Sequence, residues 1–217
     1  MSVIVKICGL KSAETLDAAL AGGADMVGFV FFEKSPRHLG RDQARLLAEQ
    51  TRGRAEKVAL LVDPDDSRIA AVIEALAPDW LQLHGAETPA RVAQVRETFG
   101  RPILKALGVA TKGDLDRASA YEKVADRVLL DAKPPNDAAL PGGNGLPFDW
   151  SLLRDHVQVA ARKNWMLSGG LTPENVGEAI RLTGAPGVDV SSGVECAPGE
   201  KSAEKILAFI AAARSAV

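Results

Sequence analysis

The chain has 217 residues, of which 47% are hydrophobic, so it is long enough to bury one sizeable core. Its 26 basic and 28 acidic residues are well mixed and give a formal net charge of -2, which argues against nucleic-acid and membrane-surface partners. No apolar run approaches the roughly 18 residues that span a bilayer. We therefore expect one domain over residues 1–217 whose partner is a small molecule.

The chain has only two cysteines, Cys8 and Cys196, which is too few for a disulfide framework. The first eight residues also lack the apolar segment of a secretory signal. Together these features predict a cytoplasmic protein. Nothing in the pattern of surface residues demands a partner chain, so we expect a monomer.

Eight short apolar runs recur along the chain. Most have the length of a strand, are rich in Val, Ile and Leu, and are nearly continuous, as is typical of parallel strands that are covered on both faces. The runs begin at Val3, Met26, Lys57, Trp80, Pro102, Arg127, Trp165 and Gly187.

Longer amphipathic segments lie between the apolar runs. Residues 15–21, 65–76 and 175–182 carry apolar side chains at helical spacing. Typical helix starts precede them, namely Ser12, Asp65, and Thr172 followed by Pro173. The sequence therefore alternates predicted strands with predicted helices.

Eight strand–helix units in one domain predict a closed (β/α)8 barrel with parallel strands, of the TIM-barrel type. A doubly wound open sheet is the alternative, but it usually needs fewer strands, and the first turn, CGLKSAE, lacks the G-x-G-x-x-G fingerprint. One connection breaks the regular spacing. Residues 133–148 form a long Gly- and Pro-rich segment, which we interpret as a functional lid.

Active sites of such barrels lie at the C-terminal ends of the strands, where two glycine-rich turns occur. SGGLTPEN and SSGVE follow the last two apolar runs, and backbone N–H groups in such turns commonly bind a phosphate. We therefore predict phosphate binding at Gly169, Gly170, Ser192 and Gly193. The alternative is that both are ordinary tight turns.

Two candidate proton-transfer groups end strands of the predicted barrel. Asp131 ends an apolar run, where a partly dehydrated carboxyl group can retain a proton and serve as a general acid. Cys8 ends the first run, and a thiolate can act as a base or a nucleophile. The structural alternatives are a helix cap or a partner of Lys133 for Asp131, and a small buried apolar residue for Cys8.

Three further residues are candidates for substrate binding. Arg37 could bind a carboxylate bidentately, and its alternative role is a solvated loop cation. His84 could contact the ligand, although a lone histidine at a strand end is more often structural. The third candidate is Asp189. The three histidines lack metal-binding spacing, so we expect neither a metal nor another cofactor.

Strand alternation yields one geometric prediction. If Cys8 faces the barrel axis, so does Lys6, and Asp189 lies on the eighth strand, which neighbours the first when the barrel closes. We predict that Lys6 and Asp189 are close enough to interact. A purely structural role for Asp189 is compatible with that pairing.

Several motifs occur together over essentially the whole chain. They are KICGLK, GFVFFEKSPR, LQLHG, LLDAKP, GGNGLPFDW, LSGGLTPENV and GVDVSSGVE. In this order they resemble the phosphoribosylanthranilate isomerase family of tryptophan biosynthesis.

The resemblance implies a cofactor-free Amadori rearrangement of a phosphorylated aminosugar. Asp131 would protonate the ribose ring oxygen, and Cys8 would remove the proton from C2 of the resulting Schiff base. Arg37 matches the residue near the anthranilate carboxylate. The resemblance also places Gly142 and Gly143 of the GGNG segment with the phosphate-binding turns.

Two departures from the family pattern are visible, Asn144 in the GGNG segment and Ser202 after the last strand. We expect activity to survive both, and Ser202 to serve as the N-cap of the last helix. Three alternatives remain. They are a sugar-phosphate epimerase, an indole-glycerol-phosphate synthase and a non-catalytic sensor of a phosphorylated ligand.

Overall fold

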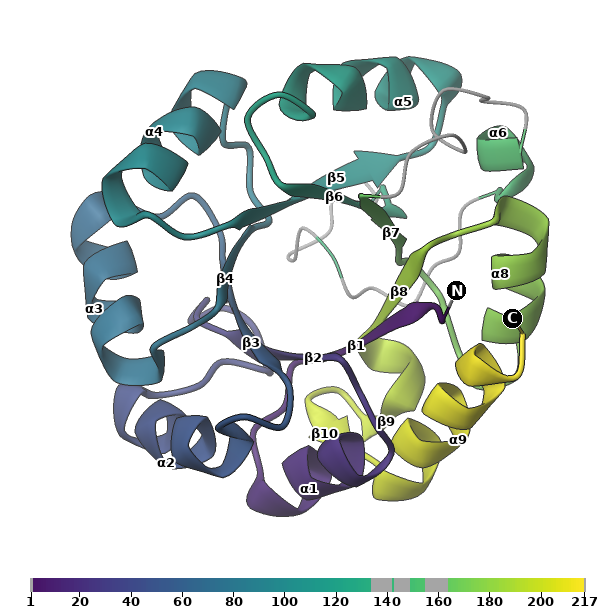
Figure 1. The fold of residues 1–217 in the computed structure, drawn as a ribbon, viewed down its shortest axis with the longest axis horizontal. Coiled ribbons are helices and arrows are strands. Elements are labelled where there is room, and N and C mark those ends of the chain that lie inside the picture. Colours follow the sequence, from purple (N-terminus) through teal and green to yellow (C-terminus); the bar gives the residue numbers. More distant parts are fainter. Residues whose placement is uncertain (1, 134–141, 143–148, 155–163, 217) are drawn as a thin grey trace.

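The computed structural model describes residues 2–133, 142, 149–154 and 164–216. Eight parallel strands pair in chain order, and the first also pairs with the eighth, so the sheet closes into a barrel (Figure 1). This confirms the predicted (β/α)8 barrel and excludes the open sheet. The strands are β1 (Ile4–Cys8), β2 (Met26–Val30), β3 (Glu56–Leu61), β4 (Trp80–Leu83), β5 (Ile103–Val109), β6 (Arg127–Ala132), β7 (Trp165–Leu167) and β8 (Gly187–Val190).

Helices surround the barrel and cover its outer face (Figure 1). They are α1 (Ala13–Ala21), α2 (Arg41–Thr51), α3 (Asp66–Leu76), α4 (Pro89–Phe99), α5 (Lys112–Ala118), α6 (Ser151–Arg154), α8 (Val176–Thr183) and α9 (Ala203–Arg214). The 3-10 turns η1 (Ser119–Tyr121) and η2 (Ser192–Val194) supplement them. After η2, the strands β9 (Glu195–Ala197) and β10 (Glu200–Lys201) form a small antiparallel hairpin.

Side-chain caps begin the helices where the sequence predicts them. The side chains of Ser12, Asp65 and Ser202 accept hydrogen bonds from backbone N–H groups in the first turns of α1, α3 and α9. Each cap satisfies a donor that has no partner within the helix. Ser202 is therefore the N-cap of the last helix, as expected.

The helix predicted over residues 175–182 is observed as α8 (Val176–Thr183), but Thr172 does not cap it. The helix begins at Val176, because the side chain of Asn175 is used to fix the preceding turn. Its Oδ1 accepts a hydrogen bond from the N–H of Thr172 at 2.8 Å, and its Nδ2 donates to the carbonyl of Gly170 at 2.9 Å. The segment around Pro173 is consequently a turn rather than the first turn of the helix.

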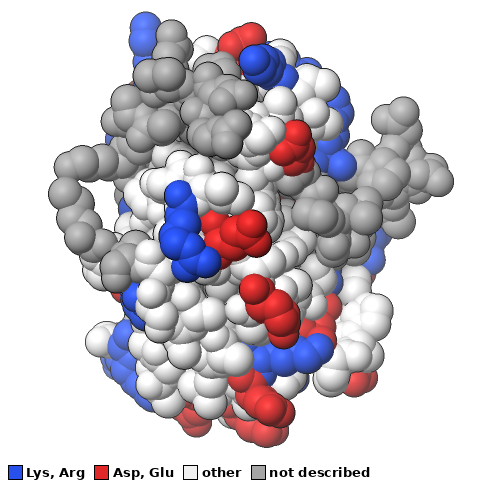
Figure 2. All heavy atoms as spheres, turned by 90° about the vertical axis from the view of Figure 1, so that its right-hand side faces the viewer, with Lys and Arg blue, Asp and Glu red and all other residues white. Residues whose placement is uncertain are grey.

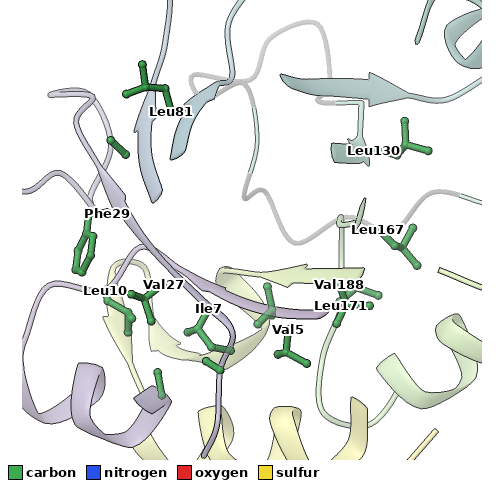
Figure 3. Close-up of a cluster of buried hydrophobic side chains, with 14 of the residues drawn as sticks. Val5, Ile7, Leu10, Val27, Phe29, Leu81, Leu130, Leu167, Leu171 and Val188 are labelled. Atoms are coloured by element: carbon green, nitrogen blue, oxygen red, sulfur yellow. The ribbon is translucent and has the colours of Figure 1, made fainter. Parts of the chain in front are cut away.

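Alternate residues of each strand pack on opposite sides of the barrel wall. Figure 3 shows Val5 and Ile7 of β1, with Val27 and Phe29 of β2, in the apolar cluster between the barrel and its helices. Because side chains alternate along a strand, the residues between them face the axis. A second apolar cluster fills the barrel interior toward the N-terminal ends of the strands. It comprises Met26, Val58, Leu104, Ala106, Leu129 and Met166.

Arg127 lies at the start of β6, beside this inner apolar cluster. Its guanidinium carbon lies 5.2 Å from the ring centre of Trp80, and its Nη1 is 3.6 Å from the sulfur of Met26. The aromatic face and the sulfur are soft partners for a cation that is partly removed from water. At this end the interior is packed, which leaves the opposite end, where the strands finish, for chemistry.

Within the described ranges, no helix is both long and apolar enough to cross a membrane. Figure 2 shows acidic and basic side chains interspersed over the face that it presents, in keeping with the mixed charge of the sequence. Of the predicted lid over residues 133–148, only Lys133 and Gly142 belong to the described residues.

Candidate active site

Cys8 is the last residue of β1, and its side chain faces the barrel interior, where it is buried. Gly28, its register partner on β2, gives it room. A Cβ at Gly28 would lie 2.8 Å from the Cys8 sulfur and 3.1 Å from Nζ of Lys6. Burial raises the pKa of the Cys8 thiol, and the charge of Lys6 opposes that rise. Cys8 is therefore a buried thiol beside a cation.

Lys6 and Asp189 form the predicted pair. They are register partners on β1 and β8, and Nζ of Lys6 lies 2.6 Å from Oδ1 of Asp189. The hydroxyl of Ser168, at the end of β7, lies 3.4 Å from the other carboxylate oxygen. The three side chains are buried, so the two charges compensate each other inside the barrel.

Asp131 lies near the end of β6 and is buried. Its Oδ1 accepts a hydrogen bond from the N–H of Ala132 at 2.9 Å, and its Oδ2 lies 3.3 Å from Nε2 of His84. The alternative partner Lys133 instead reaches Asp114, at 3.3 Å. Asp131 is thus held toward His84 rather than toward the lysine that follows it.

His84 is held between two polar side chains. Its Nδ1 lies 3.1 Å from the amide nitrogen of Gln82, which is fully buried, while its Nε2 faces Asp131. A Gln82 amide that donates to Nδ1 leaves the ring proton on Nε2, directed at the carboxyl group. The amide oxygen of Gln82 is buried and has no hydrogen-bond partner among the described residues.

Two of the glycines predicted to bind phosphate lie against Asp131. A Cβ at Gly142 would lie 2.5 Å from Oδ2 of Asp131 and 2.6 Å from Nε2 of His84. A Cβ at Gly169 would lie 3.1 Å from Oδ1 of Asp131, and Gly169 has a φ of 84°. Gly142 therefore leaves room for the carboxyl group, and Gly169 is required mainly by the backbone of Ala132, whose nitrogen would lie 2.5 Å from a Cβ, and by its positive φ. Gly143 lies outside the described residues.

The predicted turns after β7 and β8 meet in space. Gly170 has a φ of 63°, and Gly193 lies so close to this turn that a Cβ on it would collide with the carbonyl oxygen of Leu171. Ser192 and Gly193 open the short turn η2. The two segments that the sequence proposes as a phosphate cradle thus form one continuous backbone surface.

Arg37 is not the solvated loop cation that was its alternative interpretation, because it is only 6% exposed. Its Nε and Nη2 donate to the two carboxylate oxygens of Glu195, at 2.7 and 2.9 Å. Such bidentate pairing fixes the plane of the guanidinium group. Arg37 is therefore an oriented group at the rim of the barrel.

Glu195 and its second partner, Lys201, were not predicted from the sequence. Nζ of Lys201 lies 2.7 Å from Oε1 of Glu195. Burial alone would raise the pKa of Glu195, but Arg37 and Lys201 outweigh burial and lower it to about 2. The Pro-Gly turn between β9 and β10 was the available signal, because such a turn predicts a hairpin that brings its two arms together.

The hairpin also connects to the first strand. Nζ of Lys201 donates to the carbonyl oxygen of Ser191 at 2.9 Å, and the Ser191 hydroxyl donates to the carbonyl of Cys8 at 3.2 Å. Both cysteines are free thiols, and Cys196 is exposed whereas Cys8 is buried. Among the described residues, no group of three or more His, Cys, Asp or Glu side chains could hold a metal ion.

Comparisons with known proteins cover almost the entire chain. Residues 5–212 match the family model described as N-(5'phosphoribosyl)anthranilate (PRA) isomerase. A protein of Rhodopseudomonas palustris named N-(5'-phosphoribosyl)anthranilate isomerase is 58% identical to this chain, over 99% of this chain and 97% of the relative. A protein of the same name from Nitrobacter hamburgensis is 60% identical, over 100% of this chain and 95% of the relative.

A solved structure agrees with these sequence matches. The phosphoribosyl anthranilate isomerase of Thermotoga maritima superposes with a TM-score of 0.87 at 36% identity, over 98% of this chain and 99% of that one. The fold, the order of the motifs and the sequence identity over the full length all agree. The chain belongs to the N-(5'-phosphoribosyl)anthranilate isomerase family.

Proposed function

We propose that this chain isomerises N-(5'-phosphoribosyl)anthranilate in tryptophan biosynthesis, with Asp131 as general acid and Cys8 as general base. Family membership supports the reaction. One observation supports the two residues: a buried thiol and a buried carboxyl group lie on the inner face at the C-terminal ends of β1 and β6. Barrel enzymes place their reacting groups at that end.

The first step opens the sugar ring. Asp131 donates its proton to the ring oxygen, the bond between C1 and that oxygen breaks, and the nitrogen lone pair forms a C1=N double bond. The hydrogen bond between Asp131 and the N–H of Ala132 fixes one carboxyl oxygen, so the other is available for proton transfer. His84, which faces that second oxygen, is placed to support the carboxylate that results.

The second step moves a proton away from carbon. The Cys8 thiolate removes the proton from C2, the C2–H electrons form a C1=C2 double bond, and the C1=N electrons return to nitrogen. The C2 hydroxyl then loses its proton while C1 gains one, which gives the ketone. Solvent returns a proton from Cys8 to Asp131. Proton transfers account for every step, so the chemistry calls for no metal or other cofactor.

The substrate carries two anionic groups that the rim residues fit. Arg37, oriented by Glu195, is proposed to bind the anthranilate carboxylate. The phosphate is proposed to lie on the glycine turns after β7 and β8, with Gly142 and Gly143 as further phosphate-binding residues. His84 and Asp189 are proposed to contact the substrate between these ends.

Three general properties accompany this proposal. We expect residues 1–217 to act as one domain, the protein to work in the cytoplasm, and the chain to be a monomer. The Thermotoga maritima relative is described as a dimeric enzyme from which monomers were generated and solved, so both assemblies occur among the relatives. Sedimentation at increasing protein concentration distinguishes the two assemblies.

The fluorescence of phosphoribosylanthranilate provides the test. We expect the wild-type protein to remove the signal, Cys8→Ala to abolish its loss, and Asp131→Asn to slow it about 100-fold or more. Cys196→Ser, which alters the exposed thiol, should retain the wild-type rate. Binding of the substrate without turnover by the wild-type protein would support a sensor and overturn the enzyme assignment.

A further inference from the structure

Lys6 is a buried cation that the reaction steps above do not use. It is 0% exposed, and its charge is balanced by Asp189 on the neighbouring strand. Burial alone would lower the pKa of Lys6, but the charges of Asp189 and Cys8 and their hydrogen bonds outweigh burial and raise it. Lys6 therefore keeps its positive charge throughout the ordinary pH range.

The position of Lys6 brings this charge to the reacting thiol. Lys6 and Cys8 are two residues apart on β1, so both side chains point toward the barrel axis. Both also approach the space above Gly28, within 3.1 and 2.8 Å of the place where a Cβ would lie. The missing side chain of Gly28 allows the ammonium and the sulfur to share one small volume.

Three charged side chains from three strands act on Cys8. Lys6 of β1 and Lys201 of β10 favour the thiolate, whereas Asp189 of β8 disfavours it. Lys6 is the strongest of the three, and only burial of the thiol has a larger effect. Asp189 holds Lys6 at 2.6 Å, so the same carboxylate that opposes the thiolate also anchors the cation that favours it.

We propose that Lys6 is a positioning residue for the proton transfer: held by Asp189, its ammonium stabilises the Cys8 thiolate before that thiolate removes the proton from C2. The inference rests on the proposed function, because it assigns a part in that reaction. A buried thiolate without a nearby cation would be rare at neutral pH. Lys6 thus increases the fraction of molecules that are ready to react.

The experiment titrates the Cys8 thiol directly, by the ultraviolet absorbance of the thiolate as the pH is raised. It uses the Cys196→Ser background, so that Cys8 is the only thiol. Lys6→Met removes the cation alone, and the double variant Lys6→Met/Asp189→Asn removes both charges and avoids an unpaired buried carboxylate. The matched control is Lys105→Met/Glu87→Gln, which removes another buried lysine–carboxylate pair.

We expect the thiol pKa to rise by about one unit or more in the double variant, which leaves about tenfold less thiolate at neutral pH. Lys6→Met should raise it further, because Asp189 then acts on the thiol without compensation. The control pair should leave the titration unchanged. The limb of the kcat/KM profile that reports the Cys8 thiol should move with the titration in each folded variant.

An unchanged thiol titration in the double variant would overturn the inference, and so would an equal shift in the control. The two proposals fail in different measurements, because the titration requires no turnover. Full turnover by Cys8→Ala would overturn the proposed function, and with it the role of Lys6 in catalysis. An inactive Cys8→Ala together with an unmoved titration would reject only the role of Lys6.

Discussion

Two of the buried lysine–carboxylate pairs in the described part of the barrel have nearly the same internal geometry and different surroundings. Lys6–Asp189 and Lys105–Glu87 both have an N···O distance of 2.6 Å, and their side chains are at most 6% exposed. Lys6 faces the barrel axis. Lys105 alternates with the inward residues of β5 and therefore faces the helices.

Among the described residues, the side chains of the outer pair, Lys105–Glu87, form hydrogen bonds with backbone groups, unlike those of the inner pair, Lys6–Asp189. Nζ of Lys105 donates to the carbonyls of Leu83 and Gly85, at 3.3 and 2.7 Å. Glu87 accepts hydrogen bonds from the N–H groups of Gly85 and Asp63, at 3.0 and 2.9 Å. The pair thus fixes the turn that follows β4. The inner pair faces a thiol instead, so the same ionic contact serves the shape of a turn in one case and reactivity in the other.

The largest expected effect comes from removing one carboxylate of each pair. Asp189→Asn and Glu87→Gln each leave a buried ammonium group unpaired, which should lower the free energy of unfolding by about 3–5 kcal/mol. Urea denaturation followed by circular dichroism measures this loss. The similar geometry of the pairs predicts losses of similar size.

The same two variants should differ in their pH profiles. The limb of the kcat/KM profile that reports the Cys8 thiol should change in Asp189→Asn, because that carboxylate lies beside the cation next to Cys8. It should keep its wild-type midpoint in Glu87→Gln. If both variants moved the limb equally, the distinction between an inner and an outer pair would be wrong.

Glu195 differs from the carboxylates of these two pairs because it forms ion pairs with two cations, Arg37 and Lys201. Its pKa is lowered from 4.5 to about 2, so its contribution is present above about pH 4.5 and is lost as the pH falls toward 2. The shift corresponds to about 3 kcal/mol at most.

We therefore expect Glu195→Gln to unfold more easily than the wild type at about pH 6, with the difference shrinking at about pH 3. Urea denaturation at both pH values measures it. Any effect common to all carboxyl groups cancels in the difference between the two proteins. A difference that stays constant with pH would mean that the charge of Glu195 does not stabilise the fold.

The smallest expected effect concerns a neighbour of the outer pair. The hydroxyl of Tyr121 donates to the carbonyl of Glu87 at 3.0 Å, and its ring lies 5.7 Å from Nζ of Lys105. Tyr121→Phe keeps the ring and loses only the hydrogen bond, which should cost about 1 kcal/mol. The Cys8 titration should be unaffected. A larger loss than that of Glu87→Gln would mean that this hydroxyl, rather than the ion pair, is the main support of the turn after β4.

The features that depend on periodicity could be predicted from the sequence. Continuous apolar runs indicated the strands. Closure of the barrel makes the first and last strands neighbours, so closure and side-chain alternation together predicted the contact between Lys6 and Asp189. Cys8 and Asp131 were found because strand ends are where such barrels react. The glycine turns after the last two strands were found by their position and composition, whereas Gly142 and Gly143 came from the family resemblance alone.

The features that escaped prediction depend on loops and on side-chain competition. Glu195 reaches Arg37 across 158 positions in the chain. The Pro-Gly turn is a local signal for the hairpin, but no local pattern reports that the hairpin packs against Arg37. Lys105 lies within an apolar strand and gives no sign that its partner is Glu87. The cap of α8 was misplaced at Thr172 because the side chain of Asn175 binds the turn before the helix.

Gly28 has a consequence for any attempt to redesign this barrel. The space above it is already shared by the sulfur of Cys8 and the ammonium of Lys6. A bulkier base at position 8, such as a carboxylate, would need additional volume, and Gly28 has no side chain left to shorten. Because Gly28 on the neighbouring strand cannot be made smaller, a larger base at position 8 would require a shorter side chain at position 6.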